Sequence, residues 1–312
     1  MQSRNLKNIF KESFWMATDS IRKNKLRSSL TLLGISIGVF SVIGVMTAIR
    51  TLESSVESGL NVFAANTFVI QKNPEFNFGG DRRKYRNRKN ITYEQYKKLK
   101  NRSKLPLLVG PVDGTSTRNV QYKGEKLKNN VDLFGGDEGT IRFYNTFLAD
   151  GRNFINDDIH FSRNVCVLGM DVVDQLFPFE DPVGKKIKID GLGYHVIGIT
   201  ERQGEAFGES KDNYIGIPIT TFIEKFSNDW SSIRIHIESP SEQLYEKTKN
   251  EVIGHLRAIR KVAPGKENDF EVVTNTEMIE QFSVFTNGIK LFALSVSIIA
   301  LVVAGIGIMN IM

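Results

Sequence analysis

The sequence predicts an α+β membrane protein in which two transmembrane helices with outward extensions flank one large extracytoplasmic domain. Two uncharged apolar runs, 28–49 and 291–312, are each long enough to cross a bilayer, because about 20 helical residues span about 30 Å. Residues 1–29 carry seven Lys or Arg and two Asp or Glu, which accounts for +5 of the formal charge of +6 in the 312-residue chain. Basic flanks stay on the cytoplasmic side, so we expect a cytoplasmic N-terminus and place residues 51–290 outside.

The segment before the first run has the pattern of an amphipathic helix. Its apolar residues recur at helical spacing, and Lys and Arg occupy the remaining face. Such a helix is suited to lying among the lipid headgroups of the cytoplasmic leaflet, and packing against a cytosolic protein is the alternative. The residues expected at the membrane surface are Phe10, Phe14, Trp15 and Ile21.

The two predicted spans contain small residues at a spacing that lets helices approach closely. A cleaved signal peptide is the alternative for the first span, but its basic lead is too long and its apolar run too extended. A buried core helix is the alternative for the second, but apolar residues cover every face of that helix, which favours lipid. The residues expected to pack the spans are Gly34, Gly38, Ala300 and Ala304.

Apolar residues continue at helical spacing beyond both spans, which predicts that the membrane helices extend outward as amphipathic stalks. A Thr274–Glu277 capping box would start the second stalk and make a rod of about 37 residues, roughly 55 Å long. A rod of this kind can carry motion between an outer domain and an inner machine, whereas a simple anchor without transmission is the alternative. The residues expected to relay motion are Leu52, Val56, Leu60, Met278, Phe282 and Phe285.

The region between the stalks has signals for mixed α and β structure. Strands are expected at 67–71, 231–238 and 270–274, with helices at 92–102, opened by a capping box at Thr92, and at 242–261. These elements could form one βα layer. Short strands at 107–112, 115–122, 164–168, 185–190, 194–200 and 214–219, the fourth and fifth as a hairpin, predict a β-rich lobe inserted into that layer.

These patterns divide the chain into seven parts. We expect a cytoplasmic basic helix at 1–28, transmembrane helices at 29–50 and 291–312, a stalk and first part of the layer at 51–104, the lobe at 105–220, the second part of the layer at 221–275, and a stalk at 276–290.

No motif for catalysis or cofactor binding is apparent, so no catalytic, cofactor-binding or metal-binding residue is predicted. Val183–Lys186 contains a Gly-Lys pair but lacks the other residues of a phosphate-binding loop. Four scattered His and one Cys argue against a zinc site. Asp157 is better explained as part of a turn or a helix start and Asp171/Asp174 as a helix face. Cys166 lies in an apolar strand, where a buried side chain is expected.

A basic loop at 79–90 carries six Lys or Arg among twelve residues. A solvated loop is one interpretation, and an electrostatic site for anionic lipid headgroups or an acidic partner is the other. Nucleic acid is not expected as a partner outside the membrane.

Short segments along the chain form a further pattern. The basic helix is followed by Lys25-Leu-Arg-Ser-Ser-Leu-Thr-Leu-Leu-Gly-Ile-Ser-Ile-Gly38, Gly151-Arg-Asn-Phe154, Val165-Cys-Val-Leu-Gly169, Asp181-Pro-Val-Gly-Lys185 and Ala304-Gly-Ile-Gly-Ile-Met-Asn-Ile-Met312. In this order they resemble the MacB/FtsX-like permeases of ABC transporters. The likeness covers essentially the whole chain and rests on the combination of segments, because each one alone is weak.

The resemblance implies an inner-membrane permease subunit whose extracytoplasmic part is a porter-like layer with an inserted β-rich lobe. Members of that family have four spans and relay ATP-driven motion outward through stalk helices, so this chain resembles an N-terminal part with two spans. It would act as a homo- or heterodimer with a separate cytosolic ATPase that binds ATP and Mg, and would not itself be an enzyme. A periplasmic adaptor and an outer-membrane duct are further partners that the resemblance leaves open. A two-span sensor cut before its cytoplasmic output domain is the alternative function, and a membrane-anchored extracytoplasmic enzyme is a second one.

Overall fold

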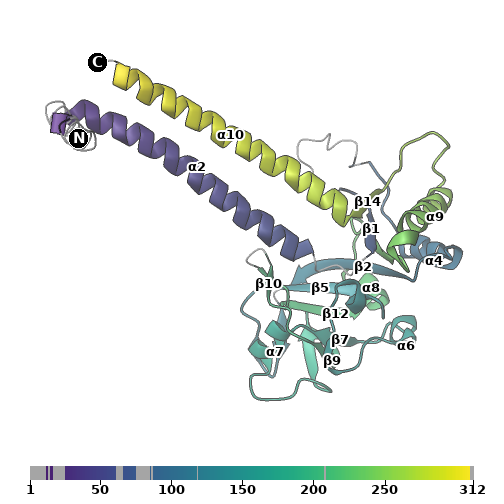
Figure 1. Cartoon of the computed structure of the whole chain (residues 1–312). Helices are drawn as coiled ribbons and strands as arrows, with labels where there is room; N and C mark the ends of the chain where they lie inside the picture. Colours follow the sequence, from purple (N-terminus) through teal and green to yellow (C-terminus); the bar gives the residue numbers. More distant parts are fainter. Residues whose placement is uncertain are drawn as a thin grey trace, which may run out of the picture. The chain divides into compact units, whose positions relative to one another are not determined.

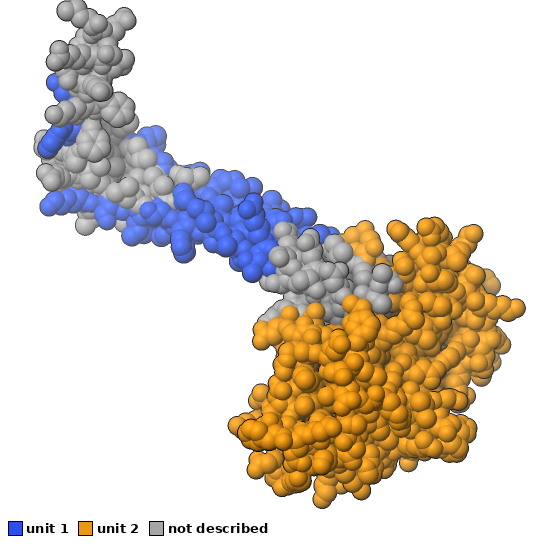
Figure 2. Space-filling view, turned by 60° about the horizontal axis from the view of Figure 1, so that its bottom comes forward, with its two compact units in different colours: residues 1–54, 282–312 blue, residues 55–281 orange. Residues whose placement is uncertain are grey.

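The computed structural model describes residues 12, 15–16, 25–60, 66–74, 85, 87–117, 119–206 and 209–309. The chain divides into two compact units, which Figure 2 shows in different colours. Unit 1 comprises residues 1–54 and 282–312, and unit 2 comprises residues 55–281.

Unit 1 is built from most of two long helices, α2 (Lys25–Leu60) and α10 (Asn275–Met309). Ile49 and Ala293 are buried in this unit, whereas many apolar side chains of the same helices are exposed. Within the described ranges, no helix is both long enough and apolar enough to span a membrane. The two predicted spans are therefore not confirmed by the structure. The predicted start of the second helix near Thr274 is confirmed, because α10 begins at the next residue.

One layer of unit 2 is a three-stranded antiparallel arrangement covered by two helices. Strand β1 (Thr67–Gln71) lies between β13 (Arg234–Glu238) and β14 (Glu271–Thr274). Helices α4 (Tyr93–Arg102) and α9 (Glu242–Arg260) contact each other and pack on these strands (Figure 1). Alternating residues of the strands turn inward, so the core of this layer contains Phe68, Ile70, Ile235, Ile237, Leu99, Val252 and Leu256. The predicted βα layer is confirmed.

Helix α4 begins at the capping box that the sequence predicts. The backbone N–H of Gln95 donates to Thr92 Oγ1, and the backbone N–H of Thr92 donates to Gln95 Oε1, each at 3.3 Å. Both otherwise unpaired backbone donors are thereby satisfied. The helix ends at Arg102, as predicted.

Strand β2 (Leu108–Thr117) joins the layer to the rest of unit 2. Its first half pairs with β13 and its second half pairs with β5 (Val131–Gly136), both antiparallel. The sequence predicted two strands with a break at 113–114, and that break is wrong, because the backbone stays extended and hydrogen-bonded to a new neighbour. The layer and the β-rich lobe therefore share one continuous sheet of twelve strands.

The β-rich lobe contains the remaining strands and four short helices. Beyond β5, the sheet continues through β12 (Tyr214–Pro218), β7 (Val165–Leu168), β9 (Leu192–Thr200), β8 (Lys186–Ile189), β3 (Val120–Tyr122) and β4 (Glu125–Lys126), with β6 (Leu148–Gly151) also paired to β9. The helices are α5 (Thr140–Phe143), α6 (Asn156–His160), α7 (Met170–Leu176) and α8 (Ile219–Phe226), and β10 (Glu205–Ala206) pairs with β11 (Glu209–Ser210).

The predicted β8–β9 hairpin is confirmed, but its turn is shorter than the gap between the predicted strands at 185–190 and 194–200, because Leu192 and Gly193 belong to β9. Asp190 and Gly191 form its turn with φ values of 47° and 84°. A two-residue turn with positive φ at both positions matches the twist of paired strands, and glycine adopts that conformation without strain.

Candidate functional site

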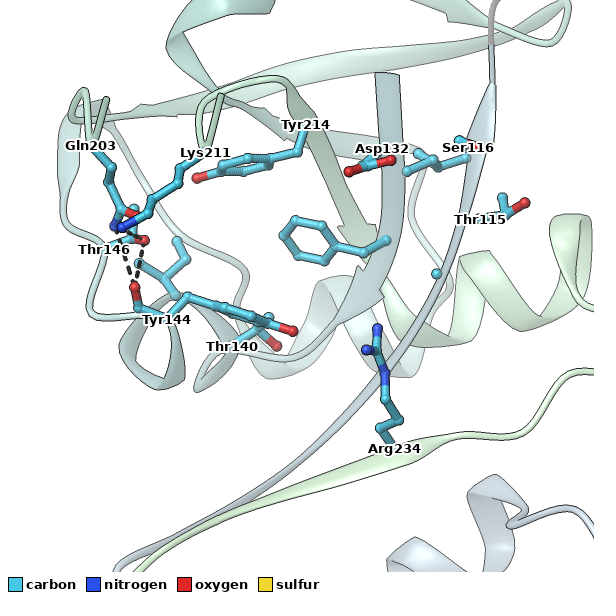
Figure 3. A pocket seen from close by; sticks show the side chains of 14 residues that line it. Thr115, Ser116, Asp132, Thr140, Tyr144, Thr146, Gln203, Lys211, Tyr214 and Arg234 are labelled. Carbon is cyan, nitrogen blue, oxygen red and sulfur yellow. Dashed lines mark hydrogen bonds between the residues drawn. The ribbon is translucent and has the colours of Figure 1, made fainter. Parts of the chain in front are cut away.

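A pocket of about 620 Å³ opens in unit 2 where the second half of β2, β5 and β12 meet α5 and the residues Gln203 and Lys211 (Figure 3). Its lining residues come from segments far apart in the sequence. They are Gly114, Thr115, Ser116, Asp132, Leu133, Phe134, Thr140, Ile141, Tyr144, Thr146, Gln203, Lys211, Tyr214 and Arg234.

Three aromatic rings form the apolar part of this pocket. The ring centroid of Phe134 lies 5.3 Å from that of Tyr214 and 6.3 Å from that of Tyr144. The hydroxyl of Tyr214 donates to Thr200 Oγ1 at 2.7 Å. Burial raises the pKa of Tyr214 to about 12, so this side chain is a neutral, fixed ring at physiological pH.

A hydrogen-bond network fixes the polar side of the pocket. The side-chain amide of Gln203 donates to the backbone carbonyls of Tyr144 and Asn145, each at 3.3 Å, and to Thr146 Oγ1. Behind it, the buried carboxylate of Asp212 accepts the backbone N–H of Gln203 at 2.9 Å. Gln203 is therefore held through both its side chain and its backbone.

Arg234, the first residue of β13, lines another part of the pocket next to the buried Asp113. Burial raises the pKa of the Asp113 carboxyl, and the positive charge of Arg234 together with the N–H of Gly114 works against that rise. The carboxylate accepts the Gly114 backbone N–H at 2.9 Å. Arg234 thus supplies a positive charge that a buried neighbouring acid only partly offsets.

A second buried polar cluster lies where α4, the β5–α5 turn and β13 meet. The hydroxyl of Tyr96 donates to Asp137 Oδ2 at 3.1 Å, and the backbone N–H of Gly139 donates to Asp137 Oδ1 at 3.0 Å. Burial raises the pKa of Asp137 to about 6, although Lys100 opposes the rise. The hydrogen bonds of this cluster join α4 to the β5–α5 turn, so we interpret it as a structural junction.

His236 belongs to the same junction and is 2% exposed. Its ring lies 5.5 Å from the ring of Phe143 and 5.4 Å from that of Tyr144. Burial lowers its pKa to about 3, and the nearby charge of Arg234 acts in the same direction. The imidazole is therefore neutral at any physiological pH.

The structure places the predicted site residues as follows. Trp15 has a side chain that is 64% exposed, whereas Phe10, Phe14 and Ile21 lie outside the described residues. The four small residues lie in the long helices, namely Gly34 and Gly38 in α2 and Ala300 and Ala304 in α10.

The six relay residues also lie in these helices. They are Leu52, Val56 and Leu60 in α2, and Met278, Phe282 and Phe285 in α10. The roles assigned to the surface, packing and relay residues stay predictions, because a position in a helix does not test them.

Several other sequence interpretations can be compared with the structure. Asp157 lies in α6 and Asp171 in α7, so both lie in helices as expected. Cys166 is 0% exposed, and burial raises the pKa of its thiol, which confirms a buried core side chain. Within the described residues, no cluster of His, Cys, Asp or Glu could hold a metal ion.

Part of the basic loop is described, and there the interpretation as a solvated loop is wrong for Arg88. Its side chain is 7% exposed and forms an ion pair with Glu271 at 2.7 Å. It also donates to the backbone carbonyl of Lys72 at 2.9 Å. This arginine therefore holds the segment against the βα layer, while residues 79–84 and 86 lie outside the described residues.

The pocket was missed by sequence reasoning. Its lining residues run from Gly114 to Arg234 and share no spacing, because sheet pairing rather than local sequence brings them together. The clustered aromatics Phe134, Tyr144 and Tyr214 have no periodic relation along the chain, so no local signal could have identified them.

Comparison with known proteins gives a consistent result. Residues 28–254 match the family described as the MacB-like periplasmic core domain. The chain is 30% identical over 307 residues to the macrolide export ATP-binding/permease protein MacB of Neisseria meningitidis serogroup A, covering 97% of this chain and 45% of that protein. The protein of the same name from Aggregatibacter actinomycetemcomitans is 29% identical, with 96% and 45% covered. The chain thus spans less than half the length of these relatives.

Two solved structures share the fold. The periplasmic region of MacB from Actinobacillus actinomycetemcomitans aligns with a TM-score of 0.59 and 18% identity, covering 73% of this chain and 97% of that one. The extracellular domain of the noncanonic ABC-type transporter YknZ from Gram-positive bacteria aligns with a TM-score of 0.51 and 18% identity, covering 67% and 100%. Because the family match includes well over half of the sequence, the chain belongs to the MacB-like periplasmic core domain family, and the resemblance to MacB-type ABC transporter permeases is confirmed.

Proposed function

We propose that this chain is a permease component of an ABC-type export complex and relays the motion of a separate cytosolic ATPase to its extracytoplasmic domain. The family match over residues 28–254 is the observation that carries the proposal. The relatives are named for ATP binding and macrolide export, and in this proposal ATP and Mg are bound by the partner ATPase. The family match does not favour the sensor alternative.

In this proposal, residues 29–50 and 291–312 cross the inner membrane, with the N-terminus in the cytoplasm and residues 51–290 outside. The support is the exposure of large apolar side chains on the two long helices. Phe40, Leu291 and Phe292 are 79%, 66% and 71% exposed on α2 and α10. Apolar surface on this scale is normally covered by lipid or by another protein. The basic flank of the first span supplies the orientation.

The relay would use the continuity of the two long helices. Both α2 and α10 contribute residues to unit 1 and to unit 2 without an interruption of the helix. A continuous helix transmits displacement along its axis, because every turn is hydrogen-bonded to the next. The relay residues named above would form the stalks, the small residues would pack the spans within a homo- or heterodimer, and Trp15 with its neighbours would contact headgroups.

The topology can be tested by cysteine labelling in intact cells. The single native cysteine, Cys166, is 0% exposed and should stay silent. We expect His195→Cys, at an exposed position of β9, to react with a membrane-impermeant maleimide, and Glu12→Cys to react only after lysis. Labelling of Glu12→Cys but not His195→Cys in unlysed cells would overturn the orientation.

The relay can be tested with helix-breaking substitutions in the complete transporter. Proline inside a helix removes a hydrogen bond and costs about 3 kcal/mol or more. Val56→Pro and Phe282→Pro should abolish transport while ATP binding by the partner remains. Val56→Ala and Phe282→Leu are the matched controls, because they keep the helix. Normal transport by both proline variants would contradict the relay.

A further inference from the structure

The pocket of Figure 3 contains two cationic side chains, Arg234 and Lys211, and the buried Asp113 lies beside the first of them. Among the residues that the structure describes, neither the guanidinium of Arg234 nor the ammonium of Lys211 forms a hydrogen bond or an ion pair. By contrast, Arg260 and Arg202 each pair with aspartate. Figure 3 shows Arg234 and Lys211 on opposite sides of the pocket.

The surface between these cations is aromatic. Tyr144 and Tyr214 lie between them in Figure 3, and the ring of Phe134 contacts both. Aromatic faces bind flat apolar groups and carry few internal rotations that binding would freeze. The volume of about 620 Å³ falls within the range of roughly 300–1,000 Å³ that small-molecule pockets usually have.

The charges of the lining residues decide whether the ligand should be acidic or basic. Asp132 is the one acidic residue among the lining residues, against the two basic residues Arg234 and Lys211. A cationic ligand would meet two positive charges against one lining carboxylate. An acidic group would instead supply the acceptors that Arg234 lacks, and guanidinium binds carboxylate, phosphate or sulfonate through paired hydrogen bonds.

We propose that this pocket binds a small molecule with a flat apolar body and one acidic group. Arg234 binds the acidic group, the rings of Phe134, Tyr144 and Tyr214 hold the body, and Lys211 adds a second positive charge at the opposite side. The site lies within unit 2 and does not depend on the proposed transport role.

The test compares two probes that differ in charge. Naphthalene-2-sulfonate carries the acidic group on a flat body, and naphthalene-2-sulfonamide is its neutral counterpart. The full chain in nanodiscs of zwitterionic lipid is titrated by calorimetry, with empty nanodiscs as the blank. We expect the sulfonate to bind at least tenfold more tightly than the sulfonamide, because hydrogen bonds to charged groups are the stronger ones.

Charge-removing variants locate the site. Arg234→Gln should weaken sulfonate binding at least tenfold and leave sulfonamide binding unchanged. Lys211→Gln should weaken sulfonate binding by a smaller factor than Arg234→Gln. Arg102→Gln, at an exposed position of α4, removes the same charge away from the pocket and should have no effect.

Three outcomes would overturn the proposal. They are equal affinity for both probes, sulfonate binding that survives unchanged in both Arg234→Gln and Lys211→Gln, and no binding of the sulfonate to the native chain. Near-ultraviolet circular dichroism of each variant shows whether the fold is retained, and Lys211→Gln keeps the test decisive if Arg234→Gln fails to fold. Each of these outcomes would leave the transport proposal standing, since labelling and proline variants test it separately.

Discussion

Two buried side chains, Asp137 and His236, should shift the pH dependence of folding in opposite directions. Burial raises the pKa of Asp137 from 3.8 to about 6 and lowers that of His236 from 6.5 to about 3. The contribution of Asp137 to the free energy of unfolding is therefore fully present below pH 3.8 and is lost as the pH rises through about 6. The contribution of His236 is present above pH 6.5 and is lost as the pH falls toward 3.

These two effects cancel in the native chain between about pH 4 and pH 6. In that window, the folded state holds about one extra proton on Asp137, and the unfolded state holds about one extra proton on His236. Each proton changes the unfolding equilibrium constant about tenfold per pH unit. When either side chain is removed, the free energy of unfolding should therefore change with pH as the other side chain dictates.

Asp137→Asn keeps an acceptor for the Gly139 N–H and removes the titration. As the pH falls from 6 to 4, this variant should lose roughly 3 kcal/mol of stability relative to the native chain, which is two pH units at one proton each. His236→Phe keeps a ring beside Phe143 and Tyr144, and it should gain a similar amount over the same interval. The double variant should return to the native slope.

The assay is denaturant unfolding of the full chain at several pH values between 4 and 7, followed by near-ultraviolet circular dichroism. All eight tyrosines lie between Tyr85 and Tyr245, so the tyrosine part of this signal reports unit 2. The other carboxylates titrate alike in every variant, so their effects cancel when the pH profile of a variant is subtracted from that of the native chain. Parallel pH profiles for the native chain and both single variants would refute the reasoning.

Four further predictions use the same unfolding assay or chemical labelling. The side chain of Arg260 is 1% exposed and donates twice to Asp269 at 2.8 Å. Arg260→Met should therefore lower the free energy of unfolding by about 3–5 kcal/mol. Arg202 is half exposed, so Arg202→Met should leave the unfolding midpoint nearly unchanged. Gly151 has φ of 80°, and a Cβ there would lie 2.3 Å from the carbonyl oxygen of Ile197, so Gly151→Ala should destabilise by about 1–3 kcal/mol. Gly191→Ala is also at positive φ but meets nothing within 4 Å, and its cost should be smaller. Cys166 should react with maleimide only at the rate at which unit 2 unfolds, and rapid labelling of the native chain would contradict its burial.

The sequence by itself determined those features that short stretches of chain encode. The capping box at Thr92 was predictable because its hydrogen bonds involve near neighbours. The β8–β9 hairpin was predictable for the same reason, although its turn lies at Asp190 and Gly191 and not between the predicted strand ends at 190 and 194. The burial of Cys166 followed from an apolar strand, and the βα layer followed from alternating strands and amphipathic helices. The resemblance that later identified the family also rested on short segments, among them Gly151–Phe154.

Only the tertiary structure decided which distant segments meet. Strand β2 continues through Asp113 because its hydrogen-bonding partner changes there from β13 to β5. No local sequence signal predicts such a change of partner. The burial of Arg88 goes with its contacts to Glu271 of β14 and to Lys72, and Asp137 lies against Tyr96 of α4. The pocket has the same origin, since its aromatic rings and its cations come from segments that lie far apart in the sequence. Hydrogen bonds within a turn depend on sequence neighbours, whereas burial and electrostatics depend on what packing brings alongside.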